Sequence, residues 1–207
     1  MHSFLKFLAE SSGGTLYVFD IDDTMFHTTA KVGVMDKSGK IIKRLSSADF
    51  TDYKLAPDER YDYSEFRNAD KFHRESRPIN KMLSKVRRIH AGVKKSANSR
   101  VIINTARTDL DDKEKFLSTF RKNDIDIDDI HVHRAGNLPG KESTAEKKVK
   151  IIKDYIMKDG YKKVVMYDDS TSNLAELLKM NREYPSIKFI AYHAQPDGTV
   201  KQYNGEK

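Results

Sequence analysis

The sequence predicts an α/β fold, in which helices cover both faces of a mainly parallel β-sheet. Short apolar runs typical of buried strands alternate along the chain with segments whose apolar residues recur at helical spacing. Parallel strands are buried on both faces, so this alternation favours a sheet that lies between two layers of helices. At 207 residues, the chain is long enough to bury such a core without disulfides or a structural metal.

Five strands are expected: Thr15–Phe19, Val101–Ile103, Ile130–His133, Lys163–Tyr167 and Ile187–Ala191. A first helix opens at Pro78, which suits an initial helical turn, and its periodicity places one set of apolar residues on one face: Ile79, Met82, Leu83, Val86 and Val93. Three more helices are marked by the apolar residues within Phe116–Phe120, Val149–Ile156 and Leu174–Leu178. This order of elements predicts a three-layer, Rossmann-like sheet.

Residues 25–77 interrupt the alternation directly after the first strand. Polar and aromatic residues alternate there, Asp36–Gly39 predicts a hairpin turn, and no long amphipathic helix is evident. We interpret Met25–Arg77 as a flap or small cap inserted into a single domain that spans residues 1–207. The tail from Asp197 to Lys207 is expected to form a short hairpin strand or a frayed end.

Composition excludes several classes of protein. No apolar stretch reaches the roughly 18–20 residues needed to span a membrane, and Met1–Gly14 lacks the apolar core of a secretory signal. The absence of cysteine excludes disulfide scaffolds, cysteine-based zinc sites and thiol catalysis. Lysine and arginine total 38 against 31 acidic residues, which gives a net charge of +7. A basic, globular, cytoplasmic protein is therefore expected.

Polar residues follow three of the predicted strands. Asp20–Thr24 follows the first strand, Asn104–Thr108 the second and Asp168–Asn173 the fourth. Because ligands of doubly wound sheets bind beyond the carboxyl ends of the strands, we expect these segments to form one site. Such a site would bring together carboxylates, hydroxyl groups and the guanidinium of Arg107.

Several carboxylates at one rim would repel each other, and a divalent cation would remove this repulsion. Magnesium fits, because it binds carboxylate oxygens together with the phosphate of a substrate. Asp20 and Asp22 are two residues apart, so along an extended strand they share a face, where one can attack while the other transfers protons. The hydroxyl of Thr105 and nearby backbone N–H groups, such as that of Ala106, can bind a phosphate oxygen.

A cationic side chain is needed beside the nucleophile and the phosphate. The sequence Ser143-Thr-Ala-Glu146 is a capping box, which predicts that a helix begins there. On this helix Lys148 falls within the arc of the apolar residues, while Lys147 points to the opposite side. We therefore expect Lys148, rather than Lys147, to reach the rim of the sheet.

These segments, in this order, resemble the motifs of the haloacid dehalogenase superfamily of phosphotransferases, which use an aspartate nucleophile. Asp20-x-Asp22-x-Thr24 resembles the first motif, Thr105 the second, Lys148 the third, and Asp168-Asp169 with Asn173 the fourth. Asn173 departs from the pattern, because many members carry an aspartate there, and this weakens one contact around the metal. The resemblance covers about residues 15–24 and 78–191 and leaves the flap unmatched.

The resemblance implies a magnesium-dependent phosphomonoester hydrolase that works through an aspartyl-phosphate. Asp20 would attack phosphorus, and Asp22 would protonate the leaving oxygen and then activate water. The side chain of Asp20, the backbone carbonyl of Asp22 and Asp169 would hold Mg²⁺, with Asp168 as the alternative to Asp169, since either could instead cap the next helix. Substrate phosphate would meet Thr24, Thr105, Ala106, Arg107 and Lys148. The carboxylate at Asp22 favours a phosphatase or phosphomutase over a dehalogenase or an ion-pumping ATPase.

The insertions bear on the substrate. Few residues separate the third strand from Ser143, so no large second cap fits, and the flap is rich in aromatic residues: Tyr53, Tyr61, Tyr63, Phe66 and Phe72. A basic, less enclosed site near aromatic residues suits nucleotides or nucleic-acid ends, and the chain looks similar to the phosphatase parts of polynucleotide kinase-phosphatases and to small phage-encoded members. The alternatives are a small-metabolite phosphatase and a non-catalytic nucleic-acid-binding module. The oligomeric state is not predicted.

Three further features have two interpretations. Arg107 binds substrate phosphate, or it pairs with Asp109 or Asp111 at the surface. His131 and His133 share a strand face as metal ligands do, but no third ligand has suitable spacing, which favours a structural role. The basic residues between Lys85 and Arg100 are more typical of a solvated helix face than of a nucleic-acid interface.

Overall fold

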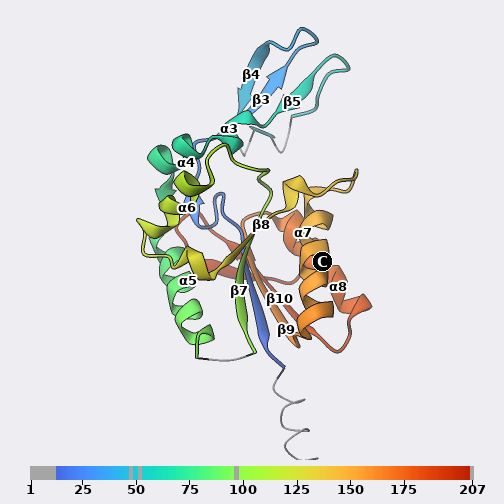
Figure 1. Ribbon diagram of the computed structural model, residues 1–207. Helices are drawn as coiled ribbons and strands as arrows, with labels where there is room; N and C mark the ends of the chain where they lie inside the picture. Colours follow the sequence, from blue (N-terminus) through green and yellow to red (C-terminus); the bar gives the residue numbers. More distant parts are fainter. Residues whose placement is uncertain (1–12, 47–48, 51–52, 96–97, 206–207) are drawn as a thin grey trace, which may run out of the picture.

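The computed structural model describes residues 13–46, 49–50, 53–95 and 98–205, and a six-stranded sheet lies at its centre (Figure 1). The strands are β1 Thr15–Phe19, β7 Arg100–Thr105, β8 His131–Arg134, β9 Lys163–Asp168, β10 Lys188–Ala194 and β11 Val200–Tyr203. They follow the order β11-β10-β9-β1-β7-β8, and all neighbours run parallel except β11, which is antiparallel to β10. The predicted α/β class with a mainly parallel sheet is confirmed.

The predicted strands are all present, with small differences at their ends. Ile130 and Ile187 lie just before β8 and β10 rather than inside them. The tail forms β11, so the hairpin strand expected after Asp197 is confirmed, while residues 206–207 lie outside the described part of the chain. The same is true of residues 1–12, on which most of the expectation about a secretory signal falls.

Helices flank the sheet, and Figure 1 shows α5 and α6 on one side of it and α7 and α8 on the other. Their bounds are α5 Asn80–Val93, α6 Lys113–Arg121, α7 Thr144–Asp159 and α8 Thr171–Glu183, with short 3-10 turns at Ile127–Asp129 and Ala135–Asn137. Alternate residues of β1 enter two cores, since Leu16 and Val18 pack with α7 and α8, whereas Phe19 packs with α5 and α6. Within the described ranges, no helix combines the length and the apolar character needed to cross a membrane.

Residues 25–77 begin and end in a two-stranded ribbon. In this ribbon β2 (Phe26–His27) pairs antiparallel with β6 (Arg77–Pro78), so the first long helix begins at Asn80 rather than at Pro78. Between these strands, β3 (Val32–Met35), β4 (Ile41–Leu45) and β5 (Arg60–Asp62) form a second sheet of order β4-β3-β5, which we call the flap sheet. The predicted turn at Asp36–Gly39 joins β3 to β4, and Figure 1 shows the flap sheet beyond the carboxyl ends of the parallel strands.

The last part of this insertion belongs to the main core. After the single turn α3 (Ser64–Arg67), helix α4 (Ala69–Glu75) buries Phe72 against Phe26 and Phe116, with ring centroids 5.4 and 5.3 Å apart. The flap sheet has a separate small core of Val32, Val34 and Leu45. Treating all of Met25–Arg77 as one flap is therefore too broad, because Phe26 and Phe72 are excluded from water only in the core of the parallel sheet.

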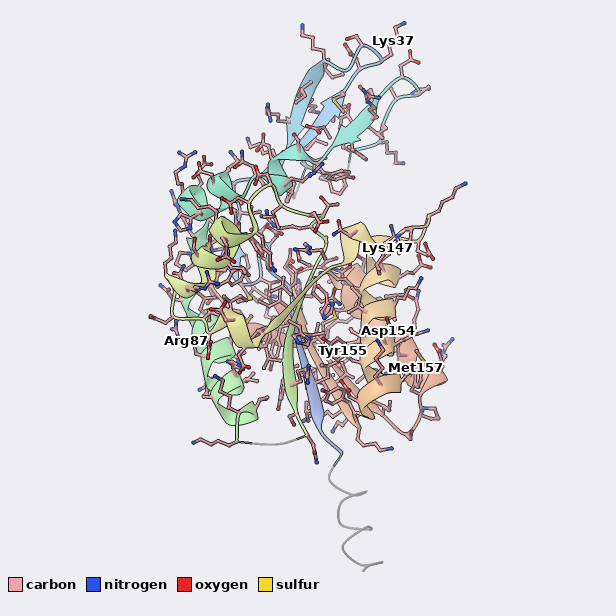
Figure 2. All side chains as sticks on the ribbon, in the orientation of Figure 1. Lys37, Arg87, Lys147, Asp154, Tyr155 and Met157 are labelled. Atoms are coloured by element: carbon pink, nitrogen blue, oxygen red, sulfur yellow. The ribbon has the colours of Figure 1, made fainter. Side chains whose placement is uncertain are left out.

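This shared core predicts the effect of truncating Phe26. Its side chain is fully buried and packs edge-to-face on Phe72 and Phe120, so Phe26→Ala should lower the free energy of unfolding by about 3–5 kcal/mol. Urea unfolding followed by far-UV circular dichroism measures the change. Met157→Ala on the exposed side of α7 (Figure 2) is the control, with an expected change below about 0.5 kcal/mol. A loss at Phe26 no larger than that of the control would contradict the shared core.

Candidate active site

Three charged side chains meet where β1 and β9 end beside α7. The ammonium of Lys148 lies 2.6 Å from Asp20 Oδ1 and 2.7 Å from Asp168 Oδ2, and the lysine side chain is 1% exposed. Asp20 directly follows β1, and Asp168 ends β9, its parallel neighbour. A buried cation thus bridges two carboxylates at the carboxyl ends of adjacent strands.

The start of α7 determines which lysine reaches these carboxylates. The predicted capping box is present, since Ser143 Oγ accepts from the N–H of Glu146 and Glu146 Oε2 accepts from the N–H of Ser143 at 2.7 Å. With the helix starting there, Lys148 shares the buried arc with Val149. Lys147 is only half-buried and lies near the start of α7 (Figure 2), so the expected choice of Lys148 over Lys147 agrees with the geometry.

The charges at this point do not balance. Burial alone would lower the pKa of Lys148, but the carboxylates of Asp168 and Asp20 outweigh it and hold this pKa above its usual value. Burial raises the pKa of Asp20 well above the usual value despite the opposing charge of Lys148, and the charges of Asp168 and Asp169 raise it further. One ammonium therefore leaves the carboxylate cluster with excess negative charge, which a further cation would neutralise.

The two aspartates after β9 have different surroundings. Asp168 is fully buried, and Oδ1 accepts from the N–H of Ser170 and from Nδ2 of Asn173, both at 2.9 Å, while Oδ2 binds Lys148. Asp169 is half-buried, and its closest side-chain contact is the hydroxyl of Thr24, 3.4 Å from Oδ1. Burial, with the charge of Asp168 adding to it, raises the pKa of Asp169 to about 7. Asp169 is therefore the carboxylate of this pair that has room for another ligand.

The residues present fit the cation that the resemblance implies. One carboxylate oxygen from each of Asp20, Asp168 and Asp169 lies within 4.8 Å of the others, close enough to share an ion. All three donors are hard oxygen ligands, which Mg²⁺ and Mn²⁺ prefer. The side chain of Asp22 lies outside this group, and the role expected for its backbone carbonyl as a metal ligand stays a prediction.

Asp22 is instead paired with Arg107. The guanidinium Nε and Nη2 donate to the two carboxylate oxygens of Asp22 at 2.9 and 2.6 Å, and the arginine is 2% exposed. Of the two interpretations of Arg107, the surface pair with Asp109 or Asp111 is wrong, because two aromatic rings bury the guanidinium, and binding of substrate phosphate stays a prediction. The central carbon of the guanidinium lies 4.5 Å from the ring centroid of Phe72 and 5.3 Å from that of Phe66.

The threonines of the expected phosphate site are buried. Thr24 is fully buried, and its Oγ1 accepts from the N–H of Asp169 at 3.0 Å, so it positions Asp169. The contact with substrate phosphate that the sequence predicts for Thr24 does not agree with this burial. The hydroxyl of Thr105 accepts from the N–H of Arg107 at 3.2 Å and is likewise buried, whereas Ala106 is exposed. The loop after β7 thus exposes Ala106 and buries the hydroxyl of Thr105.

Asn104 also belongs to the site, although no role was predicted for it from the sequence. Its Nδ2 donates to the carbonyl of Lys148 at 3.0 Å, and its buried Oδ1 has no hydrogen-bond partner among the described residues. A fully buried amide at the end of an apolar strand ties α7 to β7 directly beside Lys148. The sequence cue was a polar residue in phase with Ile102, directly after the apolar run Val101–Ile103 of the same strand.

The paired histidines of β8 lie apart from this site. His131 Nδ1 and His133 Nε2 contact the hydroxyl of Tyr155 on α7 at 2.8 and 2.7 Å, which agrees with the structural role that we favoured.

Comparison of the chain with models of known protein families gave no match, and a search of curated proteins also gave none.

The raised carboxyl pKa values predict how stability depends on pH. A folded-state pKa of about 7 for Asp169, against an ordinary value of 3.8, means that stability is greatest at low pH and is lost as pH rises through about 7. Without divalent cations, the thermal unfolding temperature should therefore decrease as the pH is raised from 5.5 to 8.5. Mg²⁺ should restore this temperature mainly at pH 8.5.

Asp169→Asn should remove the part of this pH dependence that Asp169 contributes, and weaken the response to Mg²⁺, because the amide does not ionise, while the part from Asp20 remains. The matched control is Asp154→Asn on the exposed side of α7 (Figure 2), which should leave both dependences unchanged. Differential scanning fluorimetry in EDTA and in magnesium buffer gives both measurements. A wild-type midpoint that rises with pH in EDTA would show that the carboxylates do not repel each other as described.

Proposed function

We propose that the chain is a magnesium-dependent phosphomonoester hydrolase of the haloacid dehalogenase type, with a three-layer, Rossmann-like core. The observation that carries the proposal is the Lys148 ammonium between Asp20 and Asp168, beside the open carboxylate of Asp169. A carboxylate nucleophile needs a permanent cation to stabilise it and the incoming phosphate, and Lys148 supplies that charge in a buried setting. Residues of the first, third and fourth motifs are in contact, and Thr105 of the second ends the neighbouring strand β7, which supports the proposal.

In the proposed reaction an oxygen of Asp20 attacks phosphorus, and the bond from phosphorus to the leaving oxygen breaks. The leaving oxygen takes a proton from Asp22, which produces an alcohol and an acyl phosphate on Asp20. Asp22, now ionised, removes a proton from water, and the hydroxide attacks phosphorus to release inorganic phosphate and the Asp20 carboxylate. Asp20, Asp169 and the backbone carbonyl of Asp22 would hold Mg²⁺, which when bound would offset the negative charge of the phosphoryl group.

The pair between Arg107 and Asp22 occupies both carboxylate oxygens of the second aspartate. This bidentate contact orients the Asp22 carboxylate as an acceptor, which suits the base that activates water. For Asp22 to act as an acid, this pair must loosen. Arg107 also donates to the carbonyl of Phe66 at 2.8 Å, and its Nη2 lies 3.3 Å from Thr28 Oγ1, so movement of the flap sheet can change its contact with Asp22.

The substrate class rests on the surroundings of the site. Net positive charge and the exposed ring of Tyr63, next to the flap sheet, suit a nucleotide or the phosphorylated end of a nucleic acid. A small-metabolite phosphatase is the second candidate, and it would show neither a preference for chain length nor sensitivity to salt. Comparing 3′- and 5′-phosphorylated oligonucleotides with mononucleotides and sugar phosphates separates the two.

The nucleophile is the most direct test of the proposal. Asp20→Asn should abolish hydrolysis of an aryl phosphate, by at least about a thousandfold, because the amide has the same shape but is a poor nucleophile. Acid quenching during turnover, followed by mass spectrometry, should locate the phosphoryl group on Asp20. An acyl phosphate on another residue, or no hydrolysis of any phosphomonoester by the wild type, would refute the proposal and leave a non-catalytic binding module as the alternative.

Asp22→Asn should separate substrates by their leaving groups. An alkyl phosphate needs protonation of its leaving oxygen, so its hydrolysis should fall by about a hundredfold or more, whereas an aryl phosphate with a good leaving group should lose less in the first step. Single-turnover measurement of alcohol or phenol release isolates that step. Equal losses on both substrates would argue against Asp22 as the acid.

The two neighbouring lysines provide a matched pair. Lys148→Ala should reduce kcat/KM by orders of magnitude, because it removes a charge-assisted contact to the nucleophile. Lys147→Ala should change kcat/KM by less than about threefold. Since the loss of a buried cation also destabilises the protein, Lys148→Arg, which keeps the charge, should retain the fold and still lose activity through altered geometry.

A further inference from the structure

The basic residues in and after α5 divide into two groups. Arg87, Lys94 and Arg100 are each hydrogen-bonded or ion-paired to residues of neighbouring segments: Asn123, Asp126, Asp129 and His131. Lys85 and Arg88, one turn apart on α5, form no ion pair with any of the described residues, and neither does Lys95 just after the helix. Their charge is therefore free to act on something outside the protein.

Lys85 and Arg88 lie beside a stack of aromatic rings on the sheet. The rings of Phe19, Tyr167 and Tyr192, from β1, β9 and β10, are nearly parallel, with centroids 4.6 and 5.1 Å apart and interplanar angles of 6° and 12°. The ammonium of Lys85 lies 5.7 Å from the ring centroid of Tyr167. Among the described residues, no other ring stacks on Tyr192, so the stack ends there.

This face of β10 is partly open. Ile190 and Tyr192 are half-buried, while the alternate residues Phe189 and Ala191, on the opposite face, are buried against α8. Tyr17, on the same face of β1 as Phe19, is also half-buried. Tyr167 itself is buried between them, and we call Tyr17, Tyr192, Lys85 and Arg88, together with this buried ring, the tyrosine face.

Further positive charge continues along the tyrosine face. Parallel pairing places Lys163 opposite Lys188 and Tyr167 opposite Tyr192, and an even spacing along each strand puts all four side chains on one face. At the other end, Lys81 is neutralised by Asp197 at 2.9 Å. Burial, with the nearby Tyr192 and Tyr17, raises the pKa of Tyr167 to about 12 against the opposing charge of Arg88, so its hydroxyl stays neutral.

We propose that the tyrosine face binds single-stranded nucleic acid. Aromatic rings beside unpaired cations are what a strand with unstacked bases needs, since bases stack on the rings while phosphates contact lysine and arginine. A base can extend the ring stack beyond Tyr192, and a duplex, whose bases are already stacked, cannot. This function is independent of the phosphatase proposal, because Asp168 and Lys148 lie on the opposite face of the sheet from Tyr167.

Fluorescence anisotropy of the full chain with a fluorescein-labelled dT oligonucleotide tests this assignment. The probe has no terminal phosphate and the buffer contains EDTA, so binding is measured without turnover, and success or failure of the phosphatase proposal does not affect it. The double variant Lys85→Glu/Arg88→Glu should weaken binding by at least about tenfold and reduce the salt slope of log Kd by about 1.4, or about 0.7 per phosphate contact.

The matched control reverses two exposed lysines of α7, Lys150→Glu/Lys158→Glu, with the same change in net charge. It should alter Kd by less than about twofold, and equal effects of the two double variants would overturn the proposal as non-specific attraction. Tyr192→Leu should weaken binding by about fivefold or more with an unchanged unfolding midpoint. Unchanged binding by this variant, tighter binding of a duplex of equal length, or equal competition by phosphatidylserine vesicles would also overturn it.

Discussion

A lysine ammonium buried between two carboxylates is the interaction on which the arrangement of the molecule around the site depends. Lys148, Asp20 and Asp168 come from α7, β1 and β9, so one contact ties a helix to two adjacent parallel strands. Loss of one partner would leave a buried charge uncompensated, at a cost of about 3–5 kcal/mol. The capping box at Ser143 and the amide of Asn104 serve the same contact, because they set the position of α7 along and across the sheet.

Hydrogen bonds distinguish two of the three clustered carboxylates, those of Asp168 and Asp169. Every oxygen of Asp168 already has a donor, whereas Asp169 has little besides a long contact to Thr24. Asn173 explains part of this difference, since its amide donates to Asp168 at a position where a carboxylate would repel it. The asparagine that departs from the family pattern therefore holds one aspartate in place and leaves the other open.

Periodicity and local motifs predicted most of the fold and the core of the site. The capping box predicted where α7 begins. Helical periodicity counted from that start placed Lys148, rather than Lys147, on the buried face of the helix. The partners of Arg107 and Thr24 could not be predicted in this way, because they lie 85 and 145 residues away in the chain and meet only in the folded protein. Helix α4 was missed because seven residues are too few to show helical periodicity, although Phe72 is central to the packing of the insertion.

The ribbon of β2 and β6 allows the length of the segment inserted between these two strands to change. His27 and Arg77 pair directly, so the insertion leaves and re-enters the main fold at neighbouring points. Chain length between two such points can vary at little entropic cost, since each doubling of a loop adds only about 0.6 kcal/mol. Provided that α4 is kept for the core, the flap sheet is an exchangeable module, and related scaffolds with different projections could be built on this same pair of residues.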